Sequence, residues 1–192
     1  MSQFETPTSA IEDLTGDYQL DPAHTRIGLV ARHAMVTKVR GSFKEFEGTA
    51  HLDADDPTKS SARLVVKVDS IDTGQEQRDA HLRTNDFLDA PTFPDMTFES
   101  TGVEKVGDSQ FRLTGDLTVK AVTKPITVDF EFTGSAKDPY GNLRAGFEGT
   151  ATLNRKDWGV AWNVALETGG FLVSDKVNLE FDVSALKLTP TA

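Results

Sequence analysis

The residues best suited by type to chemistry are His24, His33 and His81, with Arg78 and Asp79 just before His81. A histidine can act as a general base near neutral pH, and a nearby carboxylate can orient it. The same groups can instead form strong, charge-assisted hydrogen bonds that hold a short helix or a turn in place. The sequence leaves both roles open for these five side chains.

Residues that are absent narrow the chemistry further. The chain contains no cysteine, which excludes disulfides, thiolate nucleophiles, iron–sulfur clusters and cysteine zinc sites. It contains neither a Gly-x-Ser-x-Gly motif nor a phosphate-binding loop. The spacing of the histidines and Asp79 matches no compact metal-binding signature. We therefore expect no catalytic residue, no metal and no cofactor.

Length and charge limit the class of protein. The 192 residues include 20 Lys and Arg against 30 Asp and Glu, a net charge of −10, which is typical of one acidic domain. Because the cations are scattered, we expect no nucleic acid partner. The N-terminus has no cationic start or apolar run, and no apolar run reaches the roughly 18 residues of a membrane-spanning helix. As written, the sequence predicts a cytoplasmic protein with no membrane segment.

Alternation of apolar and polar residues is the dominant pattern between residues 17 and 188, which we expect to form one domain between tails at 1–16 and 189–192. A period of two is typical of strands with one buried face. The pattern predicts strands at Tyr18–Leu20, Arg26–Met35, Ser42–Asp53, Ala62–Ile71, Met96–Val106, Phe111–Val119, Ile126–Thr133, Phe147–Asn154 and Val177–Val183.

The number and length of these strands indicate the architecture. About eight mostly antiparallel strands form a sandwich or a barrel, and stretches of about ten residues, as at 42–53 and 109–120, favour a tall barrel. The polar stretch Gln75–Phe87 predicts a short helix, and Arg155–Gly159 predicts a turn or a single helical turn. We therefore predict an all-β fold, an extended antiparallel barrel with one or two short helices that close a mouth.

Glycine recurs on the apolar face at Gly48, Gly115 and Gly149. If these positions point inward, they leave space for a ligand in the middle of the barrel. Alternatively, they relieve strain where coiled strands bend around a filled core. The hollow barrel would be lined by these glycines and by Leu29, His33, Phe46, Phe111, Leu113, Leu117, Phe130, Phe147, Trp158, Leu179 and Phe181. Trp158 and Trp162 could line the pore or only pack beside it.

Short motifs along the chain occur in the order of one known family. They include Leu20-Asp21-Pro22-Ala23-His24-Thr25, Ile71-Asp72-Thr73-Gly74, Arg78-Asp79-Ala80-His81-Leu82, Thr123-Lys124-Pro125 and Asn154-Arg155-Lys156-Asp157-Trp158-Gly159. The sequence resembles the YceI-like family from about Gly16 to Leu188. Thr25 stands where the family usually has Ser, and Leu29 where it usually has Phe, so a hydroxyl and an apolar group are kept.

The resemblance implies a lipocalin-like barrel whose hydrophobic pore binds a polyisoprenoid chain, often in a homodimer, and many family members are exported to the periplasm. We therefore expect a non-catalytic protein that binds, stores or transports a long-chain polyisoprenoid, such as a polyprenyl quinone or phenol.

Two roles remain open for the polar residues of these motifs. His24, Arg78, Asp79 and His81 would contact the lipid head group at a pore mouth or brace the barrel. His33 would bond the head group from the lumen or be satisfied by a neighbouring side chain. One alternative is an enzyme that acts on an isoprenoid or quinone head group, with His33 or His81 as the base. Another is a structural or stress-response partner whose pore stays empty.

Overall fold

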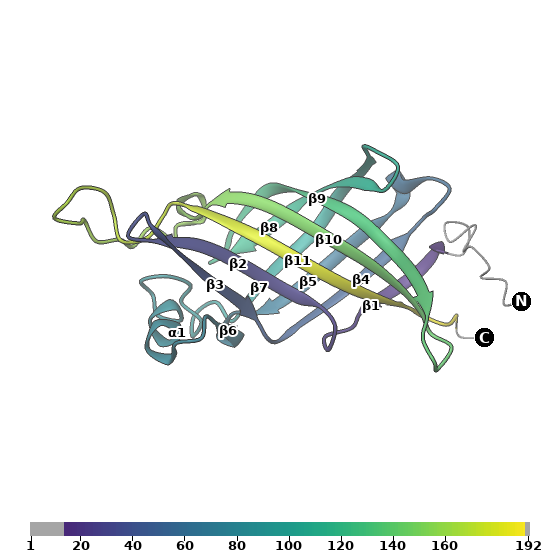
Figure 1. Ribbon diagram of the computed structural model, residues 1–192, viewed down its shortest axis with the longest axis horizontal. Helices are drawn as coiled ribbons and strands as arrows, with labels where there is room; N and C mark the ends of the chain where they lie inside the picture. The colour runs from purple at the N-terminus through teal and green to yellow at the C-terminus, as the bar shows by residue number, and fades with distance from the viewer. Residues whose placement is uncertain (1–13, 191–192) are drawn as a thin grey trace, which may run out of the picture.

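The computed structural model describes residues 14–190, which form an antiparallel β-barrel with one α-helix (Figure 1). Eight strands follow one another around the ring, and the pairing of the first with the last closes it. In ring order they are β1 (Gly16–Leu20), β4 (Phe46–Leu52), β5 (Ser61–Lys67), β7 (Asp95–Lys105), β8 (Gln110–Val119), β9 (Val122–Lys137), β10 (Leu143–Asn154) and β11 (Lys176–Lys187). The predicted all-β barrel is confirmed.

Three further strands extend the sheet at one end of the ring. They are β2 (Arg26–His33), β3 (Thr37–Phe43) and β6 (Ile71–Asp72). The same edge of β11 pairs with β1 through Ala185–Lys187 and with β2 through Asn178–Asp182. β2 then pairs with β3, and β3 with β6, which carries the chain into the helix region.

The predicted helical segments are confirmed, in shorter form. Helix α1 spans Glu76–Leu82 and lies beside β6, at the end of the barrel away from the chain termini (Figure 1). The 3-10 helix η4 spans Arg155–Trp158 and ends at Gly159, whose φ of 76° suits a residue without a side chain. Two more 3-10 turns, η2 (Pro57–Lys59) and η3 (Val68–Ser70), flank β5.

Three of the predicted strands are interrupted in the structure. The strand expected at Ala62–Ile71 is β5, which ends at Lys67 and is followed by η3 and β6. The strand expected at Arg26–Met35 ends at His33, because Ala34 and Met35 turn the chain with φ values of 52° and 64°. These residue types gave no turn signal, since left-handed turn positions usually hold Gly, Asn or Asp. The long strand expected at Ser42–Asp53 is the end of β3 followed by β4, with a corner between them.

The two predicted tails fall mostly outside the described residues. Residues 1–13 and 191–192 belong to that part of the chain. At the described edge, Leu14 is buried and accepts a hydrogen bond from the Tyr18 hydroxyl at 2.8 Å, and Gly16 begins β1. At the other end, the Leu188 N–H donates to the carbonyl of Asp17. Within residues 14–190, no helix is long and apolar enough to cross a membrane.

Candidate ligand-binding site

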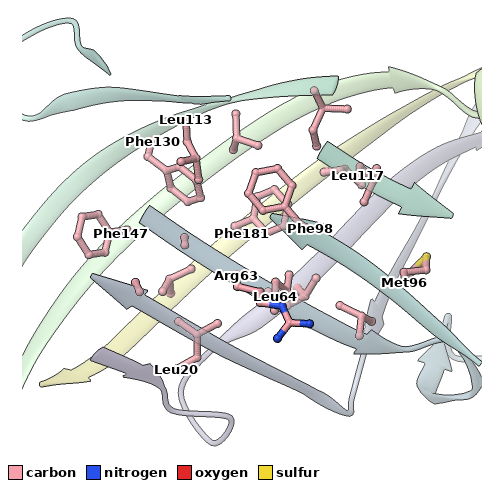
Figure 2. Close-up of a pocket in the computed structure, with 18 of the residues that line it drawn as sticks. Leu20, Arg63, Leu64, Met96, Phe98, Leu113, Leu117, Phe130, Phe147 and Phe181 are labelled. Atoms are coloured by element: carbon pink, nitrogen blue, oxygen red, sulfur yellow. The ribbon is translucent and has the colours of Figure 1, made fainter. Parts of the chain in front are cut away.

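The barrel encloses a cavity of about 430 Å³. This volume lies within the range of roughly 300–1,000 Å³ found for small-molecule sites. The cavity is lined mainly by aliphatic and aromatic side chains. Figure 2 shows the rings of Phe130, Phe147 and Phe181 directed into this space from β9, β10 and β11. Such a surface can hold an apolar molecule by burial and offers few groups for chemistry.

Most of the predicted apolar lining residues lie at the cavity surface. They are Leu29, Phe111, Leu113, Leu117, Phe130, Phe147, Trp158, Leu179 and Phe181. Phe46 is buried behind the cavity surface, in a cluster with Ile27 and Phe43, which do line the cavity. His33 is exposed at the end of β2, where it forms an isolated bridge with Val173. Ile27, Leu29 and Ala31 of β2 line the cavity, whereas His33, the next residue in that alternation, does not.

The three inward glycines are covered by neighbouring side chains. A Cβ atom at Gly149 would overlap the ring of Phe130, and one at Gly48 would overlap Leu20. At Gly115 it would overlap Phe98 and lie 2.6 Å from the carbonyl oxygen of Glu99. Each glycine therefore lets a larger neighbour lie flat on the sheet. The glycines do not form the cavity surface, and the bulky residues around them do.

One end of the cavity is sealed by a hydrophobic cluster. Phe87, which follows α1, packs with Val119, Trp158 and Val160. The indole Nε1 of Trp158 donates a hydrogen bond to the carbonyl of Leu117 at 2.9 Å. Because Trp158 is only 4% exposed and its polar atom is satisfied, it closes the wall without an unpaired buried group.

Arg155 fixes the loop that lies over this sealed end. Its buried guanidinium donates to the carbonyls of Val160, Trp162, Val173 and Ser174 at 2.7–3.3 Å. Burial lowers the pKa of Arg155, while Asp175, 3.9 Å away, opposes that effect. This structural role of Arg155 was not predicted from the sequence. Its place directly after an alternating strand, where a charge interrupts the apolar face, was the available signal.

Arg78 and Asp79 both bind Thr73, in the loop before α1. Arg78 donates to the hydroxyl and the carbonyl of Thr73 at 2.6 and 2.7 Å. The buried carboxylate of Asp79 accepts hydrogen bonds from the N–H and the hydroxyl of the same residue. Neither side chain lies at the cavity surface.

His81 lies on α1 and contacts the residues that follow the helix. Its Nε2 atom lies 2.8 Å from a carboxylate oxygen of Asp86. Its ring packs edge-on against Phe87 and Trp162, with centroid distances of 5.0 and 4.7 Å. His81 is therefore part of the cover over the sealed end and is not at the cavity surface.

His24 lies in the turn after β1 and joins an ion-pair network. Its Nδ1 atom is 2.7 Å from Asp21, which also accepts a 2.6 Å hydrogen bond from Arg144, and Arg144 donates to Asp138 as well. The bond from Arg144, with a smaller contribution from His24, lowers the pKa of Asp21 from 3.8 to about 2. Within residues 14–190, no three His, Asp or Glu side chains gather as metal ligands.

The cavity reaches polar residues on another side of the barrel. Asp53 and Ser60 line it from the connection between β4 and β5, and Lys105 and Asp108 line it from the hairpin between β7 and β8. No role was predicted for these four residues from the sequence. Ser60 and Asp108 lie between predicted strands, and all four side chains are of types that are usually solvated.

Comparison with known proteins agrees with this architecture. Residues 18–185 match the family model of the YceI-like domain. The chain belongs to the YceI-like family. A UPF0312 protein of Pseudomonas savastanoi pv. phaseolicola is 38% identical over 154 residues, 79% of this chain and 80% of the relative. A UPF0312 protein of Azotobacter vinelandii is 38% identical over 149 residues, 77% of this chain and 78% of the relative.

Solved structures share the barrel of this YceI-like chain. The YCEI protein of Campylobacter jejuni superposes with a TM-score of 0.72 at 30% identity, covering 82% of this chain and 90% of its own. Burkholderia cenocepacia BcnA gives 0.74 at 24% identity, covering 86% and 98%. A polyisoprenoid binding domain from Saccharophagus degradans gives 0.67 at 14% identity, covering 89% and 98%. The fold of these proteins is therefore that of the present chain.

Proposed function

We propose that this YceI-like protein binds a long-chain polyisoprenoid, such as a polyprenyl quinone or phenol, inside the barrel and stores or transports it without catalysis. The observation that carries the proposal is the enclosed cavity of about 430 Å³ with its apolar, largely aromatic lining. A structural relative described as a polyisoprenoid binding domain supports the same ligand class.

The strength of binding would come from the tail. Burial contributes about 0.8 kcal/mol per CH₂ group, so a tail of several isoprene units offers on the order of 10 kcal/mol before ordering costs are subtracted. Such a ligand needs no particular polar residue along most of its length. This accords with a lining whose aromatic rings contact each other, as Phe130 and Phe181 do at a centroid distance of 5.9 Å.

The alternative of an enzyme with a histidine base has less support. A base must come within about 3 Å of a reactive atom of the ligand. His24, His33 and His81 are not among the residues at the cavity surface. His24 and His81 are each bonded to an aspartate that explains their position.

Extraction of the purified protein with organic solvent, followed by mass spectrometry, tests the proposal. We expect a polyisoprenoid from the wild type and much less from Leu113→Trp, which fills the cavity. Thr114→Trp is the matched control, because this neighbouring side chain on β8 does not line the cavity. Circular dichroism spectra would verify that both variants fold. Absence of any apolar ligand, together with no uptake of an offered polyprenyl quinone, would refute the proposal.

Homodimerisation and the cytoplasmic location remain predictions from the sequence. The dimer rests on the family resemblance, and sedimentation equilibrium of the purified protein checks it. A single species at the 20.9 kDa mass of one chain would contradict it.

A further inference from the structure

Strands β5 and β7 are paired along only part of their length and then separate. Their pairing runs from Lys67–Asp95 to Arg63–Glu99 and stops there, although β7 continues to Lys105. At this point β7 changes register against β8, between Ser100 and Gly102. We call this division, beyond Arg63 and Glu99, the β5–β7 seam. A register shift of this kind bends a strand away from its former direction.

Hydrogen bonding at the seam shows how the two strands separate. The N–H of Ala62 on β5 donates to the side-chain oxygen of Ser100 at 2.8 Å, in place of a backbone carbonyl of β7. The serine hydroxyl thus satisfies the last backbone donor where the ladder ends. Beyond it, the remaining residues of β7 pair with β8 alone.

Both sides of the β5–β7 seam line the cavity. Ser60 and Ala62 contribute from the β5 side, and Val103, Lys105 and Asp108 contribute from the β7 side. The 3-10 helix η2, which packs against β7 here, has no buried residue. The apolar interior therefore meets polar, exposed groups at this place.

A second seam, between β9 and β10, is closed. Pairing of these strands stops at Asp129–Thr150, and the first part of β9 pairs only with β8. Here η4 supplies two buried residues, Arg155 and Trp158. Of the two seams, only the β5–β7 seam lacks such a closing side chain among the described residues.

Lys105 occupies the last inward position of β7. It pairs in register with Phe111, whose side chain lines the cavity, and alternates along the strand with Val103. Within residues 14–190, its ammonium group takes part in no hydrogen bond or ion pair. A lysine of this kind can lay its methylene stem along an apolar wall and keep its charged end at the surface.

We propose that the polyisoprenoid enters and leaves through the β5–β7 seam, and that Lys105 donates a hydrogen bond there to an oxygen atom of the lipid's polar head group. This inference rests on the proposed function. It identifies the head-group chemistry as an accepting oxygen, which both a quinone carbonyl and a phosphate supply.

The route is tested by the rate at which the delipidated protein takes up a fluorescent polyprenyl quinone. Val103→Trp places a large ring in the seam, and we expect uptake and release to slow by the same factor, at least about tenfold, because a steric barrier slows both rates and leaves the affinity unchanged, whereas a filled cavity would lower the affinity. Val106→Trp is the matched control, because this residue of the same hairpin is 45% exposed and does not line the cavity. Equal rates for the two variants, with binding by the wild type intact, would overturn the route and leave the proposed function standing.

The role of Lys105 is tested by Lys105→Met, which keeps the apolar stem and removes the donor. We expect affinity for a polyprenyl quinone or a polyprenyl phosphate to fall about tenfold, the value of a charged hydrogen bond, and affinity for squalene, which has no head group, to stay unchanged. Of the quinone and the phosphate, the lipid whose affinity falls more is the one whose head group Lys105 binds. Lys124→Met serves as the control, since this exposed lysine lies beside the closed seam.

A lysine at a free strand edge can also serve only to block pairing with another chain. In that case Lys105→Met would leave the affinity for all three lipids unchanged, and the assigned role would be wrong. If the wild type bound none of the three lipids, the proposed function itself would fail.

Discussion

The two seams of this barrel begin alike and end differently. At each, two neighbouring strands stop pairing before either strand ends, at Arg63–Glu99 in one case and at Asp129–Thr150 in the other. At the β9–β10 seam, the following helix η4 supplies two buried residues, Trp158 and Arg155. At the β5–β7 seam, η2 has no buried residue, and Ser60 and Lys105 line the cavity beside the partly buried Pro57. Closure of the barrel therefore depends on side chains as well as on the backbone ladder.

The difference also appears in how backbone groups are satisfied. At the closed seam, one buried arginine binds four carbonyls, which fixes a long loop as a cover. At the β5–β7 seam, a single hydroxyl, that of Ser100, receives the N–H of Ala62. Because four hydrogen bonds to a charged group hold the loop after η4, we expect this cover to open locally at a larger free-energy cost than the contact made by the one neutral hydrogen bond of Ser100.

Trp158→Ala is expected to show the largest difference in stability between the two seams. It removes a buried ring and its bond to Leu117, so we expect a loss of about 3–5 kcal/mol in the free energy of unfolding. Urea unfolding followed by circular dichroism measures it. Val103→Ala at the β5–β7 seam is the counterpart, and we expect about 1 kcal/mol because that side chain is only half-buried. Equal losses would mean that the two seams are closed equally well.

Arg155→Gln tests the hydrogen bonds of the closed seam. Several buried carbonyls would lose their donor, and we expect about 3 kcal/mol of destabilisation, with faster amide hydrogen exchange in residues 159–175. The neighbouring variant Lys156→Gln is the control, because its exposed ion pair with Asp175 is worth less than about 1 kcal/mol. Unchanged exchange in the loop would show that Arg155 does not hold it.

Two glycines extend the comparison to the barrel wall. Gly115→Ala would press a methyl group against the backbone carbonyl of Glu99 as well as the ring of Phe98, so we expect a loss of about 2 kcal/mol. In Gly149→Ala the nearest atoms to the added methyl group belong to the ring of Phe130, which can move, and we expect about 1 kcal/mol. Thermal unfolding measures both. If Gly115→Ala cost no more than Gly149→Ala, the ring of Phe98 alone would be the obstacle and the contact with the Glu99 carbonyl unimportant.

The smallest change in stability is expected for the ion pair between Asp21 and Arg144, which lies at the corner where β11 changes partner from β1 to β2. The ion pair with Arg144 lowers the pKa of Asp21 to about 2 from 3.8, so its stabilisation is present above pH 4 and is lost as the pH falls through about 2. Arg144→Gln should therefore lower the unfolding temperature most between pH 5 and 7. Below pH 2 the variant and the wild type should converge, and a constant difference at every pH would exclude this linkage.

The strands and the barrel could be predicted because their signal is local. The alternation in Phe111–Val119 or Phe147–Asn154 arises because one face of the strand is buried and the other is exposed. It can be recognised without knowing which strand is the partner. The turn at Ala34 and Met35 could not be predicted, since tertiary pairing imposes it on residues without a turn preference. The seams were missed because they depend on where two strands distant in sequence stop pairing.

Part of the candidate site could be predicted because its signal, the alternation of apolar and polar residues, is also local. The alternation of apolar residues assigns Leu117 and Phe181 to the inner face, and both lie at the cavity surface. The space, however, was attributed to Gly115 and Gly149, and only the structure shows that Phe98 and Phe130 cover them. One local signal for a seam was present in the sequence. Pro125 lies near the start of β9, in the part that pairs only with β8, and proline is found in sheets where a strand lacks a partner on one side.

Pro125 also bears on how this protein behaves at high concentration. A closed barrel offers no strand edge to another chain, but a seam exposes a short one, and free edges are where β proteins aggregate. Proline has no N–H to donate, so the unpaired part of β9 cannot continue a hydrogen-bonded ladder into a neighbouring molecule at that residue. The same residue that marks the interruption of the wall thus protects the protein from joining its copies into a continuous sheet.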